Sequence, residues 1–219
     1  YESMKETDSD IASCGAKRVW LNKNNEQELL SVNRDCVFER SEAMEALLTA
    51  NGLVQTVWNK LYRKNVTDSV LFLKGIIHED EFWSWQVIAR ARRVVTIKES
   101  CYYYLQRDNS IMGTGFSEKG LLVIRAKAER QDYIEKSMPQ LKDIGRADIV
   151  YTCMHLGIQV LKTMSWNDGA SFMKYIEGTV KSYPIGNMYL GKLACRQRLH
   201  LRLLQSLFIP ICMLHSIKH

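Results

Sequence analysis

The sequence lacks the patterns that mark most secreted, membrane-spanning and zinc-binding proteins. Its 219 residues include six cysteines but no CxxC pair, which argues against a zinc site. The chain opens without a signal-peptide pattern and contains no run of about 18 apolar residues, so we expect no membrane-spanning helix. We therefore expect a cytoplasmic protein whose cysteines are reduced and mostly buried.

Acidic residues are missing from one end of the chain. Residues 1–114 carry 15 Lys and Arg against 16 Asp and Glu, whereas residues 115–219 carry 15 against 8, and no acidic residue follows Glu177. A basic face of this kind suits an anionic partner such as membrane lipid or a phosphorylated substrate. We expect no nucleic-acid partner, because the basic residues are not interleaved with exposed aromatic or glycine-rich recognition motifs.

Two stretches combine reactive side chains with large apolar ones. Residues 57–63, VWNKLYR, have the composition of a strand that carries Lys60. Residues 75–83, GIIHEDEFW, place Glu79, Asp80 and Glu81 in the first turn of a helix, where carboxylates interact favourably with the helix dipole. A carboxylate at that position can serve as a general base, although most acidic residues in a first turn only stabilise the helix.

A third stretch, YYYLQRDNSIM at 102–112, completes a series that resembles family 2 glycosyltransferases. The resemblance is carried by NKLY at 59–62, by Glu79-Asp80 at the start of a helix, and by the three tyrosines followed by Arg107 and Ser110. It is greatest to the bacterial enzymes that build capsule, exopolysaccharide or lipopolysaccharide chains. It covers residues 1–114, which it identifies as the carboxyl-terminal, acceptor-side part of a GT-A domain.

The mix of short strands and helices over 1–114 indicates an α/β fold, and the apolar stripes after residue 115 indicate a carboxyl-terminal α-helical bundle over 115–219. The resemblance implies an inverting transfer of a sugar from a nucleotide-sugar donor to a glycan or lipid-linked acceptor. By motif position Asp80 is the base that takes a proton from the acceptor hydroxyl.

The other candidate site residues have both a binding and a structural interpretation. Lys60 and Arg107 could contact a diphosphate or an acidic acceptor, although Arg107 could equally pair with Asp108. The remaining candidates are assigned to the acceptor, and each could instead cap a helix or pack in the core: His78, Glu79, Glu81, Trp83 and Tyr104. Trp58 is a further aromatic residue whose ring could stack on a sugar.

The resemblance places the metal and nucleotide site before residue 1, so we expect the Mn²⁺ or Mg²⁺ ligands of the full-length enzyme to lie outside this chain. Asp8-Ser9-Asp10 imitates an aspartate-rich metal motif, but it leads directly into a strand at Ile11 and is interpreted as a chance match. On this interpretation the chain by itself is inactive, and no metal ligand is expected within it.

The sequence also predicts the remaining elements of residues 1–114. Residues 22–34 are polar and are expected to form a loop, and Ser41 is expected to cap a helix that ends near Ala50. Residues 94–97 and 101–104 are expected to be two short strands.

Four helices are expected after residue 115. They span residues 117–137, a segment that begins at Pro139, a segment capped by Asn167 or Asp168, and residues 185–205. In the second of these, residues 144, 147, 151, 154, 158 and 161 form an apolar stripe. The uncharged stretch 203–217 follows Arg196, Arg198 and Arg202. It suits either a helix in a membrane interface or the last helix of the bundle.

Two other classes of function remain open at this stage. The chain could be a non-enzymatic module that binds an acceptor or a partner, or a protein whose basic helices attach it to the inner face of the cytoplasmic membrane. The donor nucleotide, donor sugar, acceptor and linkage are not encoded in any pattern that we can identify.

Overall fold

The computed structural model describes residues 1–20, 23–106 and 116–217 of the chain. It divides into two compact units, Tyr1–Gly113 and Thr114–His219, and each is considered by itself. The first unit is mixed α/β, and the described part of the second unit is helical.

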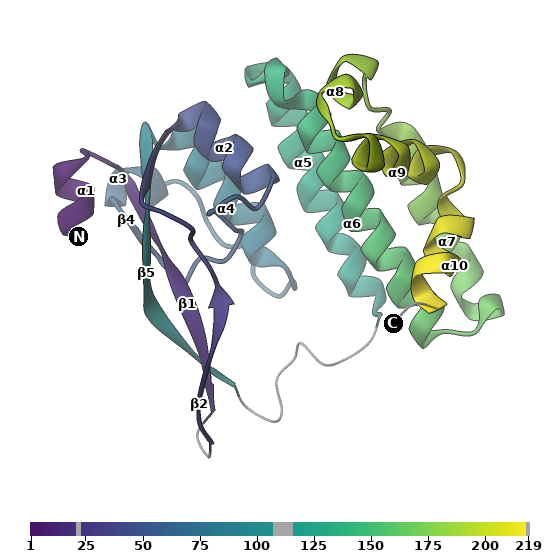
Figure 1. Ribbon diagram of the computed structural model, residues 1–219, viewed down its shortest axis with the longest axis horizontal. Helices are drawn as coiled ribbons and strands as arrows, with labels where there is room; N and C mark the ends of the chain where they lie inside the picture. The colour runs from purple at the N-terminus through teal and green to yellow at the C-terminus, as the bar shows by residue number, and fades with distance from the viewer. Residues whose placement is uncertain (21–22, 107–115, 218–219) are drawn as a thin grey trace. The chain divides into compact units, whose positions relative to one another are not determined.

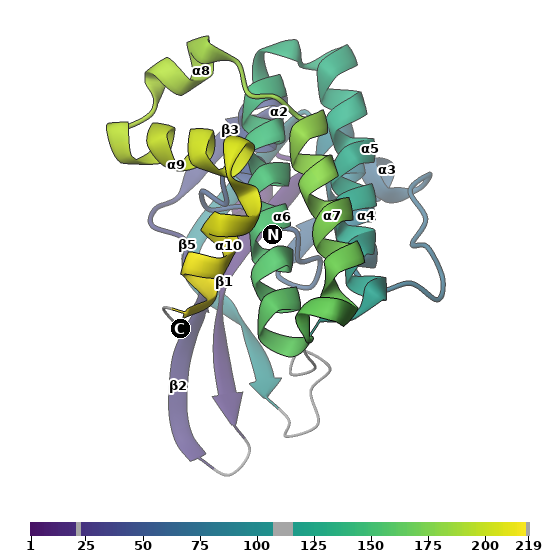
Figure 2. The ribbon, with the colours of Figure 1, turned by 90° about the vertical axis from the view of Figure 1, so that its right-hand side faces the viewer.

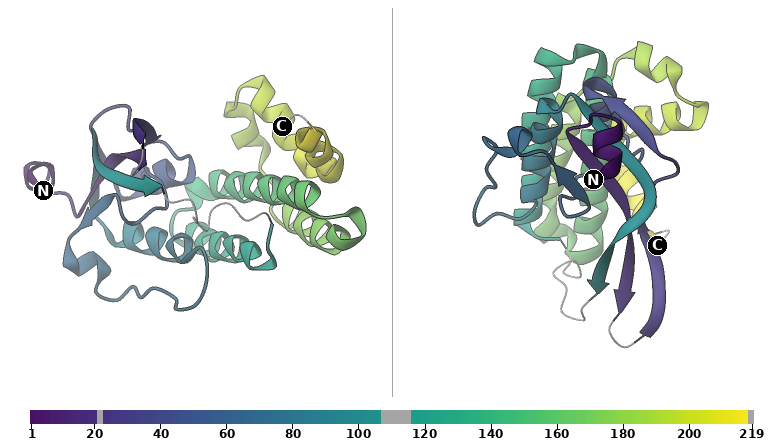
Figure 3. Two further views of the ribbon diagram at one scale, coloured as in Figure 1. Left: turned by 90° about the horizontal axis from the view of Figure 1, so that it is seen from below. Right: turned by 90° about the vertical axis from the view of Figure 1, so that its left-hand side faces the viewer.

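The first unit is built on a curled sheet whose central strand is β1 (Ile11–Trp20). β1 pairs in parallel with β5 (Arg93–Gln106) along its whole length (Figures 1 and 3). On its other side β1 pairs antiparallel with β4 (Lys60–Tyr62) at its start and with β2 (Lys23–Leu30) towards its end. β3 (Cys36–Glu39) pairs antiparallel with β5.

Helices α2 (Arg40–Leu48) and α4 (Glu79–Arg90) pack against each other beside this sheet (Figure 1). α1 (Glu2–Glu6) and α3 (Lys64–Thr67) are single turns. α4 buries Phe82, Trp83, Val87 and Ile88, and α2 buries Met44 and Leu47, so apolar positions on both helices form the core of the first unit together with residues of β1 and β5.

Close approach of three strands explains the glycine in β1. A Cβ on Gly15 would lie 2.7 Å from Ser100 Oγ and 3.0 Å from the carbonyl oxygen of Leu30, closer than real Cβ contacts allow. The register between β1 and β5 shifts at this residue. Glycine therefore allows β1 to run between β2 and β5 without a break.

Three expectations for the first unit are wrong. Residues 23–30 form strand β2 rather than a loop. β2 is an exposed edge strand, and such a strand does not need the alternating apolar residues by which strands are recognised. One of its polar side chains, Glu28, accepts a hydrogen bond from Ser100 Oγ at 2.8 Å. The two short strands at 94–97 and 101–104 are one strand, β5, which continues through the register shift. The cap of α2 is Glu39 rather than Ser41, and its backbone N–H donates to Glu42 Oε2 at 2.9 Å.

The second unit is arranged around α6 (Lys142–Thr163), which contacts α5 (Leu122–Ser137), α7 (Trp166–Ser182), α9 (Cys195–Ser206) and α10 (Phe208–Ile217) (Figure 2). Short 3-10 turns, Glu118–Leu121 and Pro139–Leu141, lead into α5 and α6. The expected stripe on α6 is only part of its buried surface, since Ile149, Val150, Cys153 and Leu156 are buried as well. Because α6 has neighbours on several sides, its buried positions extend beyond a single stripe.

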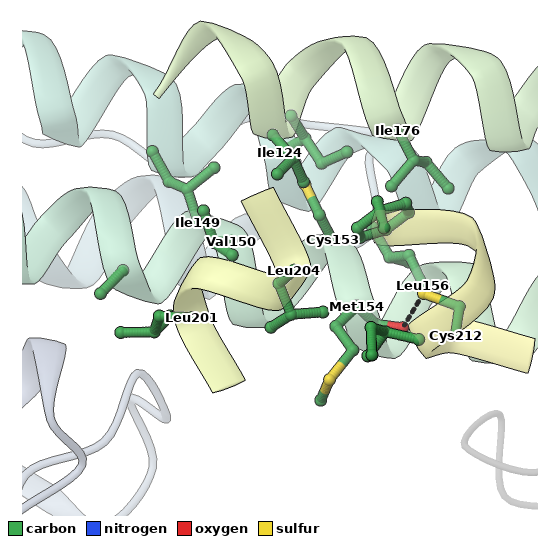
Figure 4. Packing of buried hydrophobic residues seen from close by; sticks show 14 of the residues in the cluster. Ile124, Ile149, Val150, Cys153, Met154, Leu156, Ile176, Leu201, Leu204 and Cys212 are labelled. Carbon is green, nitrogen blue, oxygen red and sulfur yellow. Dashed lines mark hydrogen bonds between the residues drawn. The ribbon is translucent and has the colours of Figure 1, made fainter. Parts of the chain in front are cut away.

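Helix α10 packs closely onto α6 (Figure 4). A Cβ on Gly157 of α6 would lie 3.0 Å from Cys212 Sγ and 3.3 Å from the ring of Phe208, so the glycine makes this contact possible. Cys212 and Cys153 are buried in the same core, and burial raises the pKa of both thiols to about 12.

Two helix boundaries of the second unit differ from expectation. α7 is capped by Ser165, whose Oγ accepts from the backbone N–H of Asp168 at 3.3 Å, rather than by Asn167 or Asp168. The helix expected at 185–205 is broken into α8 (Asn187–Lys192) and α9. Arg198 Nη2 donates to the carbonyl oxygens of Gly191 (3.1 Å) and Leu193 (3.2 Å), which satisfies acceptors left by the break.

All six cysteines are free thiols, but only Cys153 and Cys212 are buried, so the expectation of mostly buried cysteines is wrong. Within the described residues no single helix has the length and apolar composition to cross a membrane. α9 and α10 would pass that test only as a pair, and they meet at a bend of 117°.

Candidate active site

Asn59 organises the loop that precedes β4. Its side chain is buried, and its Nδ2 donates to the carbonyl oxygen of Cys14 at 2.8 Å. Its Oδ1 accepts from Thr56 Oγ1 at 2.8 Å and from Lys60 Nζ at 2.9 Å. Asn59 lies in the NKLY stretch, but its polar side chain gave no sign that it joins β1 to this loop.

The ammonium group of Lys60 has three acceptors within the protein. Besides Asn59, it donates to the carbonyl oxygen of Val54 at 2.9 Å and to that of Thr56. An ammonium group has three N–H donors, so all of them are used in folding the loop. In this structure Lys60 therefore makes internal hydrogen bonds, and its assignment as a contact to a diphosphate or an acidic acceptor stays a prediction.

Burial lowers the pKa of Lys60 to about 7, because the charged form loses hydration. Cys14 and Asp80 act in the opposite direction, since negative charge on either raises the pKa of the lysine. Asp80 thus lies within electrostatic range of Lys60.

Helix α4 begins from an unusual backbone conformation at His78. This residue is the N-cap, and its φ of 61° and ψ of 33° lie in the left-handed region, whereas most N-cap residues are extended. Left-handed conformations are uncommon for residues other than glycine and are found preferentially at functional sites. The conformation turns the chain sharply into the acidic first turn, and the imidazole of His78 is exposed there.

Asp80 is the partly buried member of that acidic turn. Its Oδ1 accepts the backbone N–H of Glu81 at 2.9 Å. Burial raises the pKa of Asp80, and the negative charge of the neighbouring Glu79 adds to this; the hydrogen bond from Glu81 and the nearby His78 lower the pKa by less. The result is a carboxylate that is more basic than an ordinary aspartate, held at the start of a rigid helix.

The aromatic candidates fall into two groups. Trp58 lies 4.4 Å from Tyr102 and 5.5 Å from Tyr104, measured between ring centroids, and all three rings are only partly buried. Trp83 is 5 % exposed, and its indole N–H donates to the carbonyl oxygen of Val70 at 2.9 Å. The assignment of Trp83 to the acceptor is therefore wrong, because its ring belongs to the core.

Phe72 and Tyr62 cover the ring of Trp83. Phe72 stacks on it at 4.7 Å and Tyr62 meets it edge-on at 5.2 Å. The hydrophobic pattern of the helix could have shown that this tryptophan faces inward, since it lies one turn before Val87 and Ile88.

Of the remaining candidates, Glu79 is exposed and Glu81 is partly buried beside Asp80. Their assignment to the acceptor stays a prediction, as does that of His78 and Tyr104. Arg107 lies outside the described residues.

A second polar cluster lies at the other end of α4. Asp10 is 2 % exposed, and its Oδ2 accepts the backbone N–H of Arg92 at 2.7 Å. Arg63 and Arg92 approach both Asp8 and Asp10 within 3.7 Å. Asp10, Arg63 and Arg92 border a pocket of about 450 Å³. The 12 residues of α4 span about 18 Å, so this pocket is distant from Asp80.

The described residues do not fit a metal site. No group of three or more His, Cys, Asp or Glu side chains comes together among them. The carboxylates of Asp8 and Asp10 instead face Arg63 and Arg92. No step of the chemistry below is therefore routed through a metal held by these residues.

No family model and no curated protein matches the chain. Among solved structures, the chain is similar to S. aureus TarS, residues 1–349, in complex with UDP-GlcNAc, with 12 % sequence identity and a TM-score of 0.42. The match covers 81 % of this chain, which spans only 58 % of the length of the TarS structure. The likeness is coarse and assigns no activity to the chain.

Proposed function

We propose that this chain is the acceptor-side part of an inverting glycosyltransferase, with Asp80 as the general base. The observation that carries the proposal is the setting of Asp80. It occupies the position that the family 2 resemblance gives to the base, it is partly buried, and its pKa is raised. Acidic residues that only stabilise a helix terminus are usually exposed. They act in their charged form, so a raised pKa does not serve that role.

The reaction that fits this carboxylate is attack by an acceptor hydroxyl on the anomeric carbon of a nucleotide-sugar. As the new carbon–oxygen bond forms, the bond from the anomeric carbon to the diphosphate breaks, and the nucleoside diphosphate leaves with the electron pair. Asp80 accepts the hydroxyl proton. Such a base contributes about 10²–10⁴-fold to the rate, and a single displacement inverts the anomeric configuration.

Other residues support this step without taking part in it. Lys60 fixes the loop at 54–60 through its hydrogen bonds to the carbonyl oxygens of Val54 and Thr56, so we assign it a positioning role. The exposed His78 and Glu79 are placed to meet acceptor hydroxyls beside the base. The partly exposed rings of Trp58 and Tyr104 are suited to stacking on a sugar.

We further propose that the acceptor is a glycan or a lipid-linked glycan of a bacterial cell-surface polysaccharide, built at the cytoplasmic side of the membrane. This rests on the resemblance carried by NKLY, by Glu79-Asp80 and by the three tyrosines. A non-enzymatic binding module is the alternative, and it predicts that the proton-accepting ability of Asp80 has no effect on any measured activity.

The test is the substitution Asp80→Asn. The amide keeps the shape and much of the hydrogen bonding but removes the basicity, so we expect turnover to fall by about 10²–10⁴-fold while donor binding is retained. The assay requires the nucleotide-binding half that the resemblance expects, so it is done on the full-length gene product. UDP-GlcNAc, the ligand of the TarS structure, is the first donor to try.

Asp68→Asn is the matched control, because Asp68 is an exposed carboxylate of the same unit at the end of α3. We expect it to leave turnover unchanged. In the wild-type enzyme, the acid limb of the pH profile should reflect a pKa above that of an ordinary aspartate, since the base works only when deprotonated. Retention of more than about a tenth of turnover in Asp80→Asn would remove the base from this position.

A further inference from the structure

The exposed side of α9 and α10 is not that of an ordinary surface helix. In α10 the exposed positions are Pro210, Met213, Leu214 and Ile217, which recur at helical spacing and include no polar side chain. Leu214 is 59 % exposed and Ile217 is 82 % exposed. The outer face of a surface helix is normally polar, so a continuous apolar face marks a site of interaction.

The opposite face of the same two helices is part of the core. Leu201, Leu204, Phe208, Ile211 and Cys212 are all buried (Figure 4). The packing of these residues fixes which side of each helix is exposed. The apolar exposure is therefore not a loose tail but the outer surface of a packed element.

Exposed positive charge is carried by α9, the helix that precedes α10 in the chain. In α9 the exposed positions include Arg196, Leu199 and Arg202, which follow one another at intervals of three residues and so lie on one side of the helix. Arg198 differs, because its guanidinium caps the break after α8. Residues 178–217 contain no acidic side chain, so no carboxylate of this segment can neutralise the two exposed arginines.

We propose that the surface formed by Arg196, Leu199, Arg202, Leu207, Met213, Leu214 and Ile217, here called the α9–α10 surface, binds the surface of an anionic phospholipid bilayer. The aliphatic side chains would enter the boundary between headgroups and acyl chains, and the two arginines would contact lipid phosphates. The bend of 117° between α9 and α10 leaves each helix too short to span a bilayer but free to lie in its interface (Figure 2).

Charge favours a lipid surface over a second copy of the chain. A symmetric dimer built on this surface would bring two copies of Arg196 and Arg202 into one interface with no acidic residue of the segment to pair with them. A bilayer that contains anionic lipid supplies both the apolar phase and the compensating charge. The proposal does not depend on the proposed function, because it concerns the second unit alone.

The proposal is tested by sedimentation of the whole chain with vesicles of phosphatidylcholine alone and with vesicles of equal parts phosphatidylcholine and phosphatidylglycerol. We expect binding to the anionic vesicles that weakens as salt is added, and much weaker binding to the neutral ones. Equal binding to both, or no binding to either, would overturn the proposal.

Two paired variants locate the surface. Each basic residue near an anionic bilayer contributes about five-fold to binding, so the double variant Arg196→Gln/Arg202→Gln should bind on the order of 30-fold more weakly. Lys136→Gln/Lys174→Gln is its control, since it removes two exposed positive charges from α5 and α7 of the same unit. Equal loss in both pairs would show general charge attraction and overturn the assignment to this surface.

Leu214→Ser/Ile217→Ser should weaken binding about 10- to 100-fold, whereas Tyr175→Ser, at a 53 % exposed position of α7, should not. All of these changes are at exposed positions, so equal melting temperatures are expected and are measured for each protein. Sedimentation velocity over a range of protein concentrations completes the test. A dimer that Leu214→Ser/Ile217→Ser abolishes would assign the surface to a second copy of the chain and overturn the lipid proposal.

Discussion

At the scale of single residues, Lys60 shows how a charged group can serve to hold a loop. Its three N–H donors are all used by oxygens of residues 54, 56 and 59. Nothing in the sequence near Lys60 identifies these acceptors, because two of them are backbone carbonyls. The sequence marks the lysine as unusual, and only the structure shows that it holds a loop.

Lys60 makes the stability of the first unit depend on pH. Its pKa is about 7 in the folded protein and 10.5 for an ordinary lysine, so between these values the unfolded chain binds more protons than the folded one. The free energy of unfolding should therefore rise with pH across this window, by at most about 1.4 kcal/mol per pH unit. Urea unfolding followed by tryptophan fluorescence measures it.

The control is Lys60→Met, which should lack this contribution. Tyrosines and cysteines with raised pKa values, such as Tyr62, oppose the trend at the alkaline end, so the difference between wild type and Lys60→Met is the informative quantity. A difference that stays constant from pH 7 to 10 would show that Lys60 titrates normally in the folded protein.

Asp80 and Trp83 show the opposite limits of prediction from sequence. The first-turn position of Asp80 and the apolar residues that follow it were sufficient to predict the helix, whereas the partial burial of the carboxylate is seen only in the structure. Trp83 is three residues further along, and its aromatic ring suits sugar binding as well as core packing. Its place in the core depends on Phe72 and Tyr62, which come from other parts of the chain.

At the scale of elements, α10 is a helix of the bundle, which is one of the two possibilities that the sequence left open, and its attachment to a membrane interface stays a proposal. Its inner face packs in the core of the second unit, and its outer face is exposed and apolar. Hydrophobic composition alone could not distinguish the buried face of α10 from the exposed one, since both faces are made of the same residue types. Burial of Phe208, Ile211 and Cys212 in the core of the second unit fixes which face of the helix is exposed.

Phe208 and its neighbour Leu207 test that orientation. Phe208 is 1 % exposed and Leu207 is 50 % exposed. Phe208→Ala should lower the free energy of unfolding by about 3–5 kcal/mol, because it leaves a cavity against α6, whereas Leu207→Ala should cost less than about 1 kcal/mol. Chemical denaturation of both variants measures this. Similar costs for the two substitutions would mean that α10 is not held in the described orientation.

Strands were harder to predict than helices for a physical reason. α4 to α7 each carry a repeated apolar pattern over several turns, which persists wherever one face is buried. β2 is a polar edge strand, and β3 has only four residues, so neither has enough buried positions to show a period. The break between α8 and α9 was missed because it depends on Arg198 reaching back to two carbonyl groups.

At the scale of the whole molecule, the two units have different charge and composition. The excess of basic residues belongs to the second unit, where α9 and α10 lie, and the candidate base belongs to the first. Two of the three stretches that carry the family 2 resemblance meet in the first unit, since the ring of Trp58 lies 4.4 Å from that of Tyr102. The resemblance says little about the second unit, where helices of a common kind follow.

The resemblance also predicts how the chain behaves towards a donor. It places the metal and nucleotide site outside residues 1–219, so this chain alone should bind a nucleotide-sugar weakly and without dependence on metal. Calorimetric titration with UDP-GlcNAc, with and without Mn²⁺, measures this. Binding in the submillimolar range that requires Mn²⁺ would contradict the prediction and place the nucleotide site within this chain.

The position of β1 at the centre of its sheet has a consequence for folding. Its parallel partner β5 follows after most of the first unit has been synthesised. Likewise, the buried carboxylate of Asp10 accepts a hydrogen bond from the backbone N–H of Arg92, 82 residues later. In the second unit, by contrast, α6 packs against its sequence neighbours α5 and α7 as well as against the more distant α10. Closing so long a loop costs chain entropy before any contact offsets it. On the ribosome, β1 therefore remains without its parallel partner until β5 has emerged.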